Sequence, residues 1–394
     1  MSEKIVIAGS CRTPMGKLGG QLKDFTALDL LTICFKETLL RSGLPDLNRI
    51  DHVIAGQCAQ SSDAPNIARV AALKIGIPKE VPAFTVQRNC GTGLQPIVSA
   101  CQMIKAGDAK VVLVGGTESM SNIPRVLRKS REAQKYGDLK VVDALMEGLR
   151  DPILGESMGE LTEDLAKKEE ISREDQDEFA ASSHQKAFRA SREGKFKSQI
   201  VPIRVGETII AKDEGIIPNL KAQVLAATSK KYFFKKGGSV HYGNSCPTSD
   251  GAAALVVMTM EMAELYKIKP EAEILGYEFK GCDPAFMGMG PAYAIPHALA
   301  NARITRTDVD FFEINEAFAA QVLACQRKLD SPLGSVGLEK INPWGGAIAM
   351  GHPVGATGAI LTTKLIYILK DLKKNLGVVS MCIGGGQGGA MVIR

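Results

Sequence analysis

The sequence has few aromatic residues, little net charge and no long apolar run. Aromatic side chains make up 5% of the 394 residues, and the formal net charge is +5. A charge this small does not indicate a nucleic-acid partner, although it suits an anionic small molecule. The longest apolar stretches, residues 252–258 and 360–369, are shorter than the ~20 residues that a transmembrane helix needs. We therefore expect neither a transmembrane segment nor a nucleic-acid partner.

The cysteines occur without any C-x-x-C pair. There are nine, an odd number, at positions 11, 34, 58, 90, 101, 246, 282, 325 and 382. This spacing suggests neither a disulfide framework nor a zinc site. Reduced thiols in a cytosol-like compartment are the better interpretation, so we expect a cytoplasmic protein with no bound metal.

Strand-like and helix-like segments alternate through most of the chain. Strands are predicted at 4–8, 51–56, 84–86, 110–115, 252–259, 272–279, 311–314 and 378–383, and helices at 27–41, 66–75 and 94–106. This alternation predicts an α/β protein with a parallel or mixed sheet covered by helices. The surroundings of Cys90 and Cys382, a strand followed by a thiol and glycines, also resemble each other. A duplicated α/β half is the interpretation of that echo.

The middle of the chain differs in composition. Residues 121–242 are polar and charged, and the pattern from Ser172 to Asp175 predicts the start of a long helix over 173–193. This part is interpreted as an inserted, loop-rich unit. The expected division is an N-terminal half at 1–120, completed by about 246–271, an inserted loop domain at 121–245, and a C-terminal half at 272–394.

Cys90 lies in the segment Gln87-Arg88-Asn89-Cys90-Gly91-Thr92-Gly93, at a predicted turn from strand to helix. A helix N-terminus carries partial positive charge and free N–H groups, which lower the pKa of a thiol and favour the thiolate. A free cysteine taken alone is more often buried and inert. The glycine-rich turn favours a nucleophile here.

Three further positions carry candidate chemistry. His352, between Gly351 and Pro353, is a candidate base or donor to a carbonyl oxygen, against the alternative of a structural histidine. Asn315 follows the strand at 311–314, where it either holds a water or orients the base, or simply caps a turn. Cys382 is the third position, and a second thiol there suits proton transfer.

The glycines after Cys382 match the dinucleotide pattern G-x-G-x-x-G at positions 384, 386 and 389. That pattern needs a following helix, and only five residues follow Gly389. The dehydrogenase interpretation is therefore rejected. Glycines here more plausibly let backbone N–H groups face an oxyanion.

These motifs, taken in order, resemble the thiolase family over nearly the full length of the chain. The matching segments are 12–16, 87–93, 116–120, 243–244, 250–253, 315–318, 345–347, 351–353 and 382–386. The resemblance implies a thiolase-like five-layer αβαβα fold from two similar halves, with an inserted loop domain. It also implies reversible, coenzyme A-dependent Claisen cleavage and condensation of 3-ketoacyl-CoA, including acetoacetyl-CoA formation.

The resemblance also implies roles for particular residues. Cys90 is the acylated nucleophile, Cys382 is the general acid/base, and His352 activates the nucleophile and faces the substrate oxygen with a water held by Asn315. The backbone N–H groups of Cys90 and Gly384 form a second oxyanion hole. Substrate or coenzyme A contacts are expected from Met158, Lys231, Cys246, Met287 and Phe318. Lys231 and the basic start of the insertion, around Arg125 and Arg128, could meet phosphates or could be a solvated face.

Coenzyme A is then a co-substrate, with no permanently bound cofactor. A homodimer or homotetramer, a role in fatty-acid β-oxidation, and a hydratase/dehydrogenase partner subunit are further expectations from the resemblance. Gln87, Ser157, Cys246 and Trp344 depart from the short-chain biosynthetic members, which leaves the acyl length open. Two alternatives stay open as well. A ketoacyl synthase generally has His or Asn in place of Cys382, and a non-catalytic acyl-CoA carrier or assembly subunit usually lacks a catalytic residue.

Overall fold

The computed structural model describes residues 3–132, 136–228, 233–330 and 336–394. Lys231, a predicted coenzyme A contact, lies outside the described residues. Within the described part of the chain, no helix is both long and apolar enough to cross a membrane.

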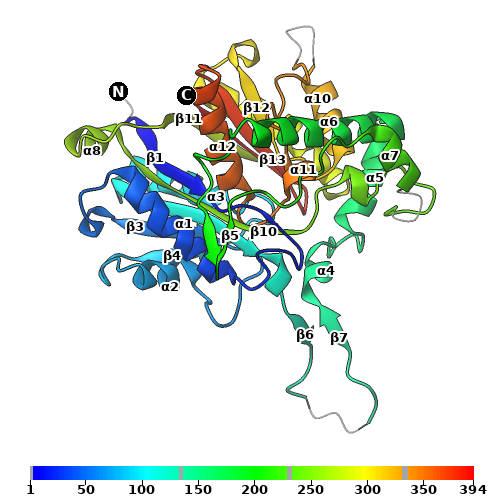
Figure 1. Ribbon diagram of the computed structural model, residues 1–394, viewed down its shortest axis with the longest axis horizontal. Coiled ribbons are helices and arrows are strands. Elements are labelled where there is room, and N and C mark those ends of the chain that lie inside the picture. Colours follow the sequence, from blue (N-terminus) through cyan, green and yellow to red (C-terminus); the bar gives the residue numbers. More distant parts are fainter. Residues whose placement is uncertain (1–2, 133–135, 229–232, 331–335) are drawn as a thin grey trace.

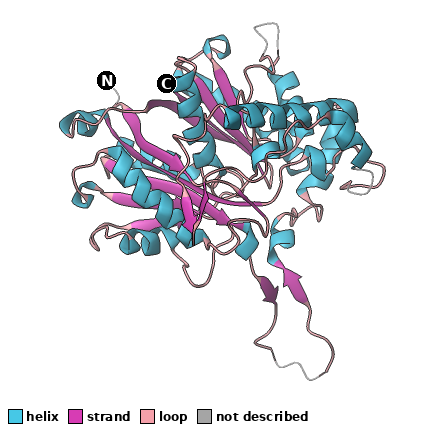
Figure 2. Cartoon of the chain, in the orientation of Figure 1, coloured by secondary structure: helices cyan, strands magenta, loops and turns pink. Residues whose placement is uncertain are grey.

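A mixed sheet of ten strands runs through the molecule (Figure 2). Its order is β12-β13-β14-β11-β1-β10-β5-β3-β4, and β2 pairs with β10. The strands of the N-terminal half are β1 (Ile5–Arg12), β2 (Gly16–Lys17), β3 (His52–Gly56), β4 (Ala83–Val86), β5 (Val111–Ser119) and β10 (Ser249–Thr259). Those of the C-terminal half are β11 (Ala272–Gly281), β12 (Phe311–Ile314), β13 (Gly377–Ile383) and β14 (Gln387–Ile393). Antiparallel pairing of β1 with β11 joins the two halves.

Helices form three layers around the two halves of the sheet, which gives the predicted five-layer order (Figure 1). α1 (Ala27–Ser42) and α2 (Ile67–Lys74) cover the outer face of the N-terminal half. α9 (Gly290–Ala302) and α10 (Ala319–Leu329) cover the outer face of the C-terminal half. α3 (Gln95–Ala106) and α12 (Thr357–Asp371) lie in the middle, in one core with strands of both halves.

Strand β10 shows how the sequence produces this layering. Every residue of β10 is buried, because helices cover both of its faces. Val256 packs in the core with α1, whereas its neighbours Leu255 and Val257 pack in the core with α3 and α12. Successive side chains of a strand point to opposite faces, so a continuous apolar run supplies both cores.

The two halves repeat the same pairing. In the first, β3 is parallel to β4 and β5, β10 is antiparallel to β5, and β1 is antiparallel to β10. In the second, β12 is parallel to β13, β14 is antiparallel to β13, and β11 is antiparallel to β14. A single parallel bridge from Phe312 to Ile341 takes the place of β4. The predicted duplication of an α/β half is therefore correct.

The duplication was inferred from the similar surroundings of Cys90 and Cys382, but these two residues do not occupy equivalent places in the two halves. Cys382 lies inside β13, the counterpart of β5, whereas Cys90 lies in the turn before α3. The residue whose place repeats that of Cys90 is His352, because each stands five residues before the first residue of its central helix. Glycines near both thiols produced the false match.

β5 and β14 also differ from the prediction. β5 continues through Gly115 and Gly116 to Ser119, because both glycines pair with β10. A Cβ at Gly115 would lie 2.8 Å from Phe35, so this glycine permits close packing and does not end the strand. β14, which the glycines at 384–389 concealed, pairs with β11 and β13.

The chain between β5 and β10 carries two small hairpins and most of the remaining helices. The hairpins are β6 (Arg125–Leu127) with β7 (Val141–Asp143), and β8 (Ile203–Val205) with β9 (Thr208–Ile210). The helices here are α4 (Ala144–Gly148), α5 (Met158–Lys168), α6 (Arg173–Arg192) and α7 (Ala222–Thr228); α8 (Met260–Leu265) and α11 (Ala347–Met350) lie elsewhere. The β6–β7 hairpin projects from the body of the molecule (Figure 1). A buried ion pair, 2.7 Å between Arg12 and Asp213, ties this segment to β1.

The N-terminal turns of α3 and α12 touch backbone to backbone. A Cβ at Gly93 would lie 2.8 Å from the carbonyl group of Ala356, and one at Gly358 would lie 2.6 Å from the carbonyl carbon of Gly93. Neither atom belongs to a flexible side chain, so neither can move aside. These glycines therefore set how closely the two central helices approach.

Replacement of Gly358 by alanine is expected to destabilise the fold. The added methyl group would overlap the backbone of Gly93 and Leu94, and such overpacking costs about 1–3 kcal/mol of unfolding free energy. Urea unfolding measures the change. The matched control is Gly281→Ala, where nothing lies within 4 Å of the added Cβ. Equal stability of the two variants would contradict the role of this contact.

Candidate active site

A cavity of about 640 Å³ lies where the two halves and the segment between β5 and β10 meet. The predicted site residues that line it are Cys90, Met158, Cys246, Met287, Phe318, His352, Cys382 and Gly384. Asn315 does not line the cavity, but its side chain contacts that of His352, which does. The structure therefore brings together every predicted site residue that it describes.

The turn that carries Cys90 is held from both halves of the molecule. Asn89 adopts a left-handed conformation, with φ of 43°, and its Nδ2 donates to the carbonyl oxygen of Gly384 at 2.9 Å. The Cys58 thiol donates to the carbonyl oxygen of Asn89 at 3.1 Å. A Cβ at Gly91 would lie 2.6 Å from the side-chain end of Ile383, so the glycine lets this turn pack closely on the end of β13. Asn89 and Cys58 were not predicted as site residues, and only the unusual backbone angle and the contacts identify them.

The expectation of a lowered thiol pKa at Cys90 is not met. Burial is the largest effect and raises the pKa of the Cys90 thiol, although the backbone N–H groups of Gly384 and Cys90 act in the opposite direction. The helix proper begins only at Gln95, so its N-terminus is too distant to dominate. Cys90 is thus a thiol that needs a base. The same two N–H groups point at the position of its sulfur, where they can stabilise a negative charge.

His352 is held as a neutral base. The Thr357 hydroxyl donates to the carbonyl oxygen of Pro353 at 3.0 Å, so its 2.6 Å contact with His352 Nδ1 must be accepted from an Nδ1–H. That assignment leaves Nε2 with a lone pair. Burial lowers the pKa of His352 to about 4, so the ring is uncharged near neutral pH.

Asn315 lies beside this lone pair. Its Nδ2 is 3.4 Å from His352 Nε2, and its backbone N–H donates to the carbonyl oxygen of Ser380 at 2.9 Å. Its side-chain oxygen is fully buried and accepts no hydrogen bond from any described residue. A buried amide oxygen needs a donor, and a water or a substrate group can supply one.

Cys382 is the last but one residue of the buried strand β13, just before a glycine turn. Burial raises the pKa of its thiol well above the ordinary value, and the neighbouring thiols of Cys90, Cys325 and Cys246 raise it further. Cys382 is therefore protonated before any reaction, as a proton donor must be. Gly385 and Gly386, with φ of 84° and 79°, form the turn that places Gly384 next to Cys90.

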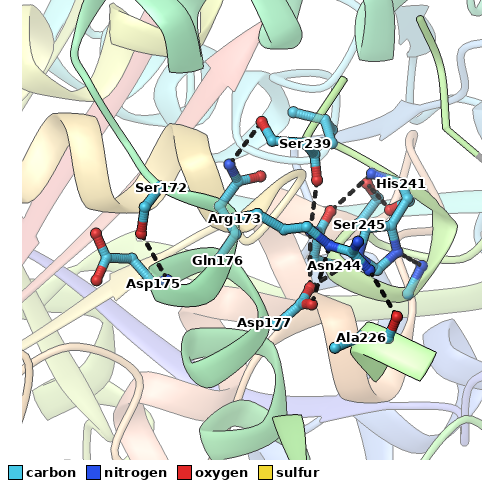
Figure 3. A network of polar contacts seen from close by, with 12 residues as sticks. Ser172, Arg173, Asp175, Gln176, Asp177, Ala226, Ser239, His241, Asn244 and Ser245 are labelled. Atoms are coloured by element: carbon cyan, nitrogen blue, oxygen red, sulfur yellow. Dashed lines mark hydrogen bonds and ion pairs between the residues drawn. The ribbon is translucent and has the colours of Figure 1, made fainter. Parts of the chain in front are cut away.

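One wall of the cavity is apolar and borders a buried polar network. Cys246, whose N–H donates to the carbonyl oxygen of Ala317 at 3.0 Å, packs in one cluster with Met158, Met287 and Phe318. Figure 3 shows the network behind it, in which His241 and Asn244 both contact Asp177 of α6, at 2.7 and 3.1 Å. Ser245, the residue before Cys246, donates from its hydroxyl to the carbonyl oxygen of His241.

These groups define a class of site. A thiol nucleophile, a neutral imidazole base, a second protonated thiol and two convergent N–H groups serve covalent acyl transfer, with proton transfer to or from carbon. A fold of two α/β halves, with this set at their junction, defines an acyl-transferring enzyme.

Comparisons with known proteins identify the family. The domain described as "Thiolase, N-terminal domain" matches residues 5–261, and "Thiolase, C-terminal domain" matches residues 268–394. A probable acetyl-CoA acyltransferase of Staphylococcus epidermidis is 43% identical over 396 residues, covering 99% of this chain and 98% of that protein. The chain belongs to the thiolase family, and it is an acyltransferase.

Solved structures agree. Acetyl-CoA acetyltransferase of Bacillus anthracis has a TM-score of 0.95 at 41% identity, covering 100% of this chain and 98% of that one. Human mitochondrial 3-ketoacyl-CoA thiolase has a TM-score of 0.95 at 40% identity, with the same coverage. The human enzyme has also been solved in complex with CoA.

Alkylation of the free enzyme tests the ionisation of Cys90. Because burial raises its pKa, the rate of iodoacetamide reaction at Cys90 is expected to keep rising beyond about pH 8.5, the ordinary thiol value. Peptide mass spectrometry reports alkylation at this position, and Cys90→Ala provides the background from other thiols. A plateau near neutral pH would instead indicate a preformed thiolate.

Thr357→Val tests the orientation of His352. Without the hydroxyl, Nδ1–H loses its acceptor and the imidazole is free to turn, so kcat is expected to fall by roughly ten- to a hundredfold while KM changes little. Steady-state kinetics measures both constants. Thr357→Ser keeps the hydroxyl and is expected to retain most of the activity. A valine variant as active as the serine variant would show that other contacts fix the ring.

Proposed function

We propose that this thiolase cleaves and forms 3-ketoacyl-CoA thioesters, including acetoacetyl-CoA, through an acyl group on Cys90. The observation that carries the proposal is the shared cavity of Cys90, His352 and Cys382, each in the protonation state that the reaction needs. Coenzyme A is the co-substrate, a role supported by the human relative solved with CoA.

Cleavage begins with proton transfer from Cys90 to His352 Nε2. The thiolate attacks the 3-keto carbon, whose oxygen is stabilised by the N–H groups of Cys90 and Gly384. The bond between C2 and C3 then breaks, and the acyl group stays on Cys90. The departing acetyl-CoA enolate takes a proton from Cys382 at C2. Its oxygen faces His352, whose Nε2–H is now a donor, and a water held by Asn315.

Coenzyme A completes the cycle. Its thiol gives a proton to the Cys382 thiolate and attacks the acyl carbon, so acyl-CoA leaves and Cys90 recovers its proton from His352. Each group returns to its starting state, and condensation is the same sequence in reverse. Met158, Cys246, Met287 and Phe318 contact the substrate in this proposal, since they form the apolar wall.

The finer biological context is also proposed. Nine free thiols support a cytoplasmic enzyme, and the exposed Leu139 and Val141 near the projecting hairpin support assembly into a homodimer or homotetramer. Participation in fatty-acid β-oxidation, with a hydratase/dehydrogenase partner, is proposed from the resemblance to the family. The division at 1–120 with 246–271, 121–245 and 272–394 is supported by the pairing of β10 with β5 and β1.

Turnover of 3-ketoacyl-CoA tests the reaction. The enzyme mixed with acetoacetyl-CoA and coenzyme A is expected to consume the enolate absorbance, and longer 3-ketoacyl thioesters then reveal the acyl preference. Cys90→Ala is expected to abolish turnover and acyl-enzyme formation. Cys382→Ala is expected to reduce kcat by roughly 10²–10⁴-fold, the contribution of a positioned acid/base.

Two results would count against this function. Normal turnover of Cys382→Ala would remove the role given to that thiol. No turnover by the unaltered enzyme on any 3-ketoacyl-CoA would leave the alternative of a non-catalytic acyl-CoA carrier or assembly subunit.

A further inference from the structure

Glu118 is a buried carboxylate in the wall of the catalytic cavity that the reaction above does not use. It lies near the end of β5, and 1% of its surface is exposed. Its Oε2 accepts from the backbone N–H groups of Cys58 at 3.1 Å and Gly355 at 2.9 Å, and its Oε1 accepts from that of Ala59 at 3.2 Å. No lysine, arginine or histidine within the described ranges forms an ion pair with it.

The donors belong to both halves of the molecule. Gly355 stands three residues after His352, in the turn that leads into α12, and a Cβ there would lie 2.7 Å from Glu118 Oε2. Cys58 follows β3, and its thiol contacts the carbonyl oxygen of Asn89 and the hydroxyl of Thr92, both at 3.1 Å. Those two atoms flank Cys90. One carboxylate therefore connects the turn of the base with the turn of the nucleophile.

The charge of Glu118 affects the strength of this connection. An ionised carboxylate accepts hydrogen bonds at both oxygens, and charge-assisted bonds are roughly twice as strong as neutral ones. A protonated carboxyl is neutral and bears its proton on one oxygen, which then accepts hydrogen bonds more weakly, and both Oε1 and Oε2 accept one or more N–H groups here. Loss of the charge would thus loosen at least one of the three backbone contacts.

We propose that Glu118 is a positioning residue, which in its ionised form holds the turns of His352 and Cys90 at their reacting distance. Its kinetic test rests on the proposed function, because it is read out in 3-ketoacyl-CoA turnover. Glu118 itself touches neither substrate nor the reacting atoms in this role.

The electrostatic surroundings agree with the geometry. Burial raises the pKa of Glu118 to about 7, against the lowering effect of the N–H groups of Ala59, Cys58 and Gly355. The Cys58 thiol is the titratable group in contact with Glu118. Burial has the largest effect and raises the pKa of that thiol, and the charge of Glu118 raises it further. The other titratable side chains that line the cavity, apart from Glu118 and Cys58, are Cys90, Glu147, Arg150, Asp151, Cys246, His352 and Cys382.

The sign of the pH effect follows from these values. His352 loses its proton near pH 4 and is already a neutral base at pH 5, so it cannot produce a loss of activity near neutrality. Ionisation of Glu118 rises through about pH 7, and kcat should rise with it. An acid limb of kcat near pH 7 is therefore expected in the unaltered enzyme.

Glu118→Gln is the decisive variant, because it keeps the shape and removes the charge. At pH 8 its kcat is expected to fall about 10- to 100-fold, the range for a slightly misplaced reacting group, with KM changed less than about threefold. The acid limb near pH 7 should disappear. Asp310→Asn is the control: Asp310 also accepts two backbone N–H groups, at Asn375 and Leu376, but lies outside the cavity. Its kcat and limb should match those of the unaltered enzyme.

A second variant covers the case in which Glu118→Gln does not fold. Cys58→Ala removes the contacts to Asn89 and Thr92 but leaves Glu118 in place, so kcat should fall while the limb near pH 7 remains. The proposal is overturned if Glu118→Gln keeps the kcat and the acid limb of the unaltered enzyme, or if the unaltered enzyme turns over with no limb near pH 7. An unaltered enzyme without any turnover would defeat the proposed function instead. The rate of iodoacetamide alkylation at Cys90, which needs no substrate, would then be compared between Glu118→Gln and the unaltered chain, as a measure of the state of the Cys90 turn.

Discussion

The backbone contact between the N-terminal turns of α3 and α12 determines where the chemistry takes place. Gly93 and Gly358 leave no room for side chains, so the turns approach as closely as two backbones can. Each turn carries one reactive group five residues before its helix, Cys90 on one and His352 on the other. The pseudo-symmetry of the two halves thus places the proposed nucleophile and the proposed base at equivalent points, and the contact between the helices brings these points together.

Burial then sets the protonation states, and it acts on each group in the direction that disfavours charge. Both thiols are kept protonated and the imidazole is kept neutral, so the resting site carries no charge on its three reacting groups. In the proposed reaction, charge appears only when a proton moves from Cys90 to His352. The N–H groups of Cys90 and Gly384 are already in place for the negative charge that follows, which costs no reorganisation at that moment.

Contacts to the backbone around the cavity also hold the proposed reacting groups in place. Asn89 links the Cys90 turn to Gly384 across the two halves, and Glu118 links the His352 turn, through Gly355, to Cys58 and Ala59, where the Cys58 thiol contacts the Cys90 turn. The wall that bears Cys246 is held from behind by Asp177 and His241. Reacting atoms supplied by segments far apart in the chain stay in register because polar contacts to backbone, rather than apolar packing alone, fix each segment.

The amino-acid sequence by itself determined the α/β fold class, eight of the ten strands of the main sheet and the helices α1, α2 and α3 of the N-terminal half, and it indicated the candidate site residues; it did not predict β14 or the helices of the C-terminal half. Periodicity and glycine-flanked thiols are patterns of neighbouring residues, so they can be recognised in the sequence without the structure. The tertiary structure decided the rest. It showed that the counterpart of Cys90 is His352 and not Cys382, that burial raises the pKa of Cys90, and that Asn89, Thr357 and Glu118 contact the turns around the site. Desolvation and hydrogen bonds between distant segments depend on what packs around a group, and no local pattern of residues encodes that environment.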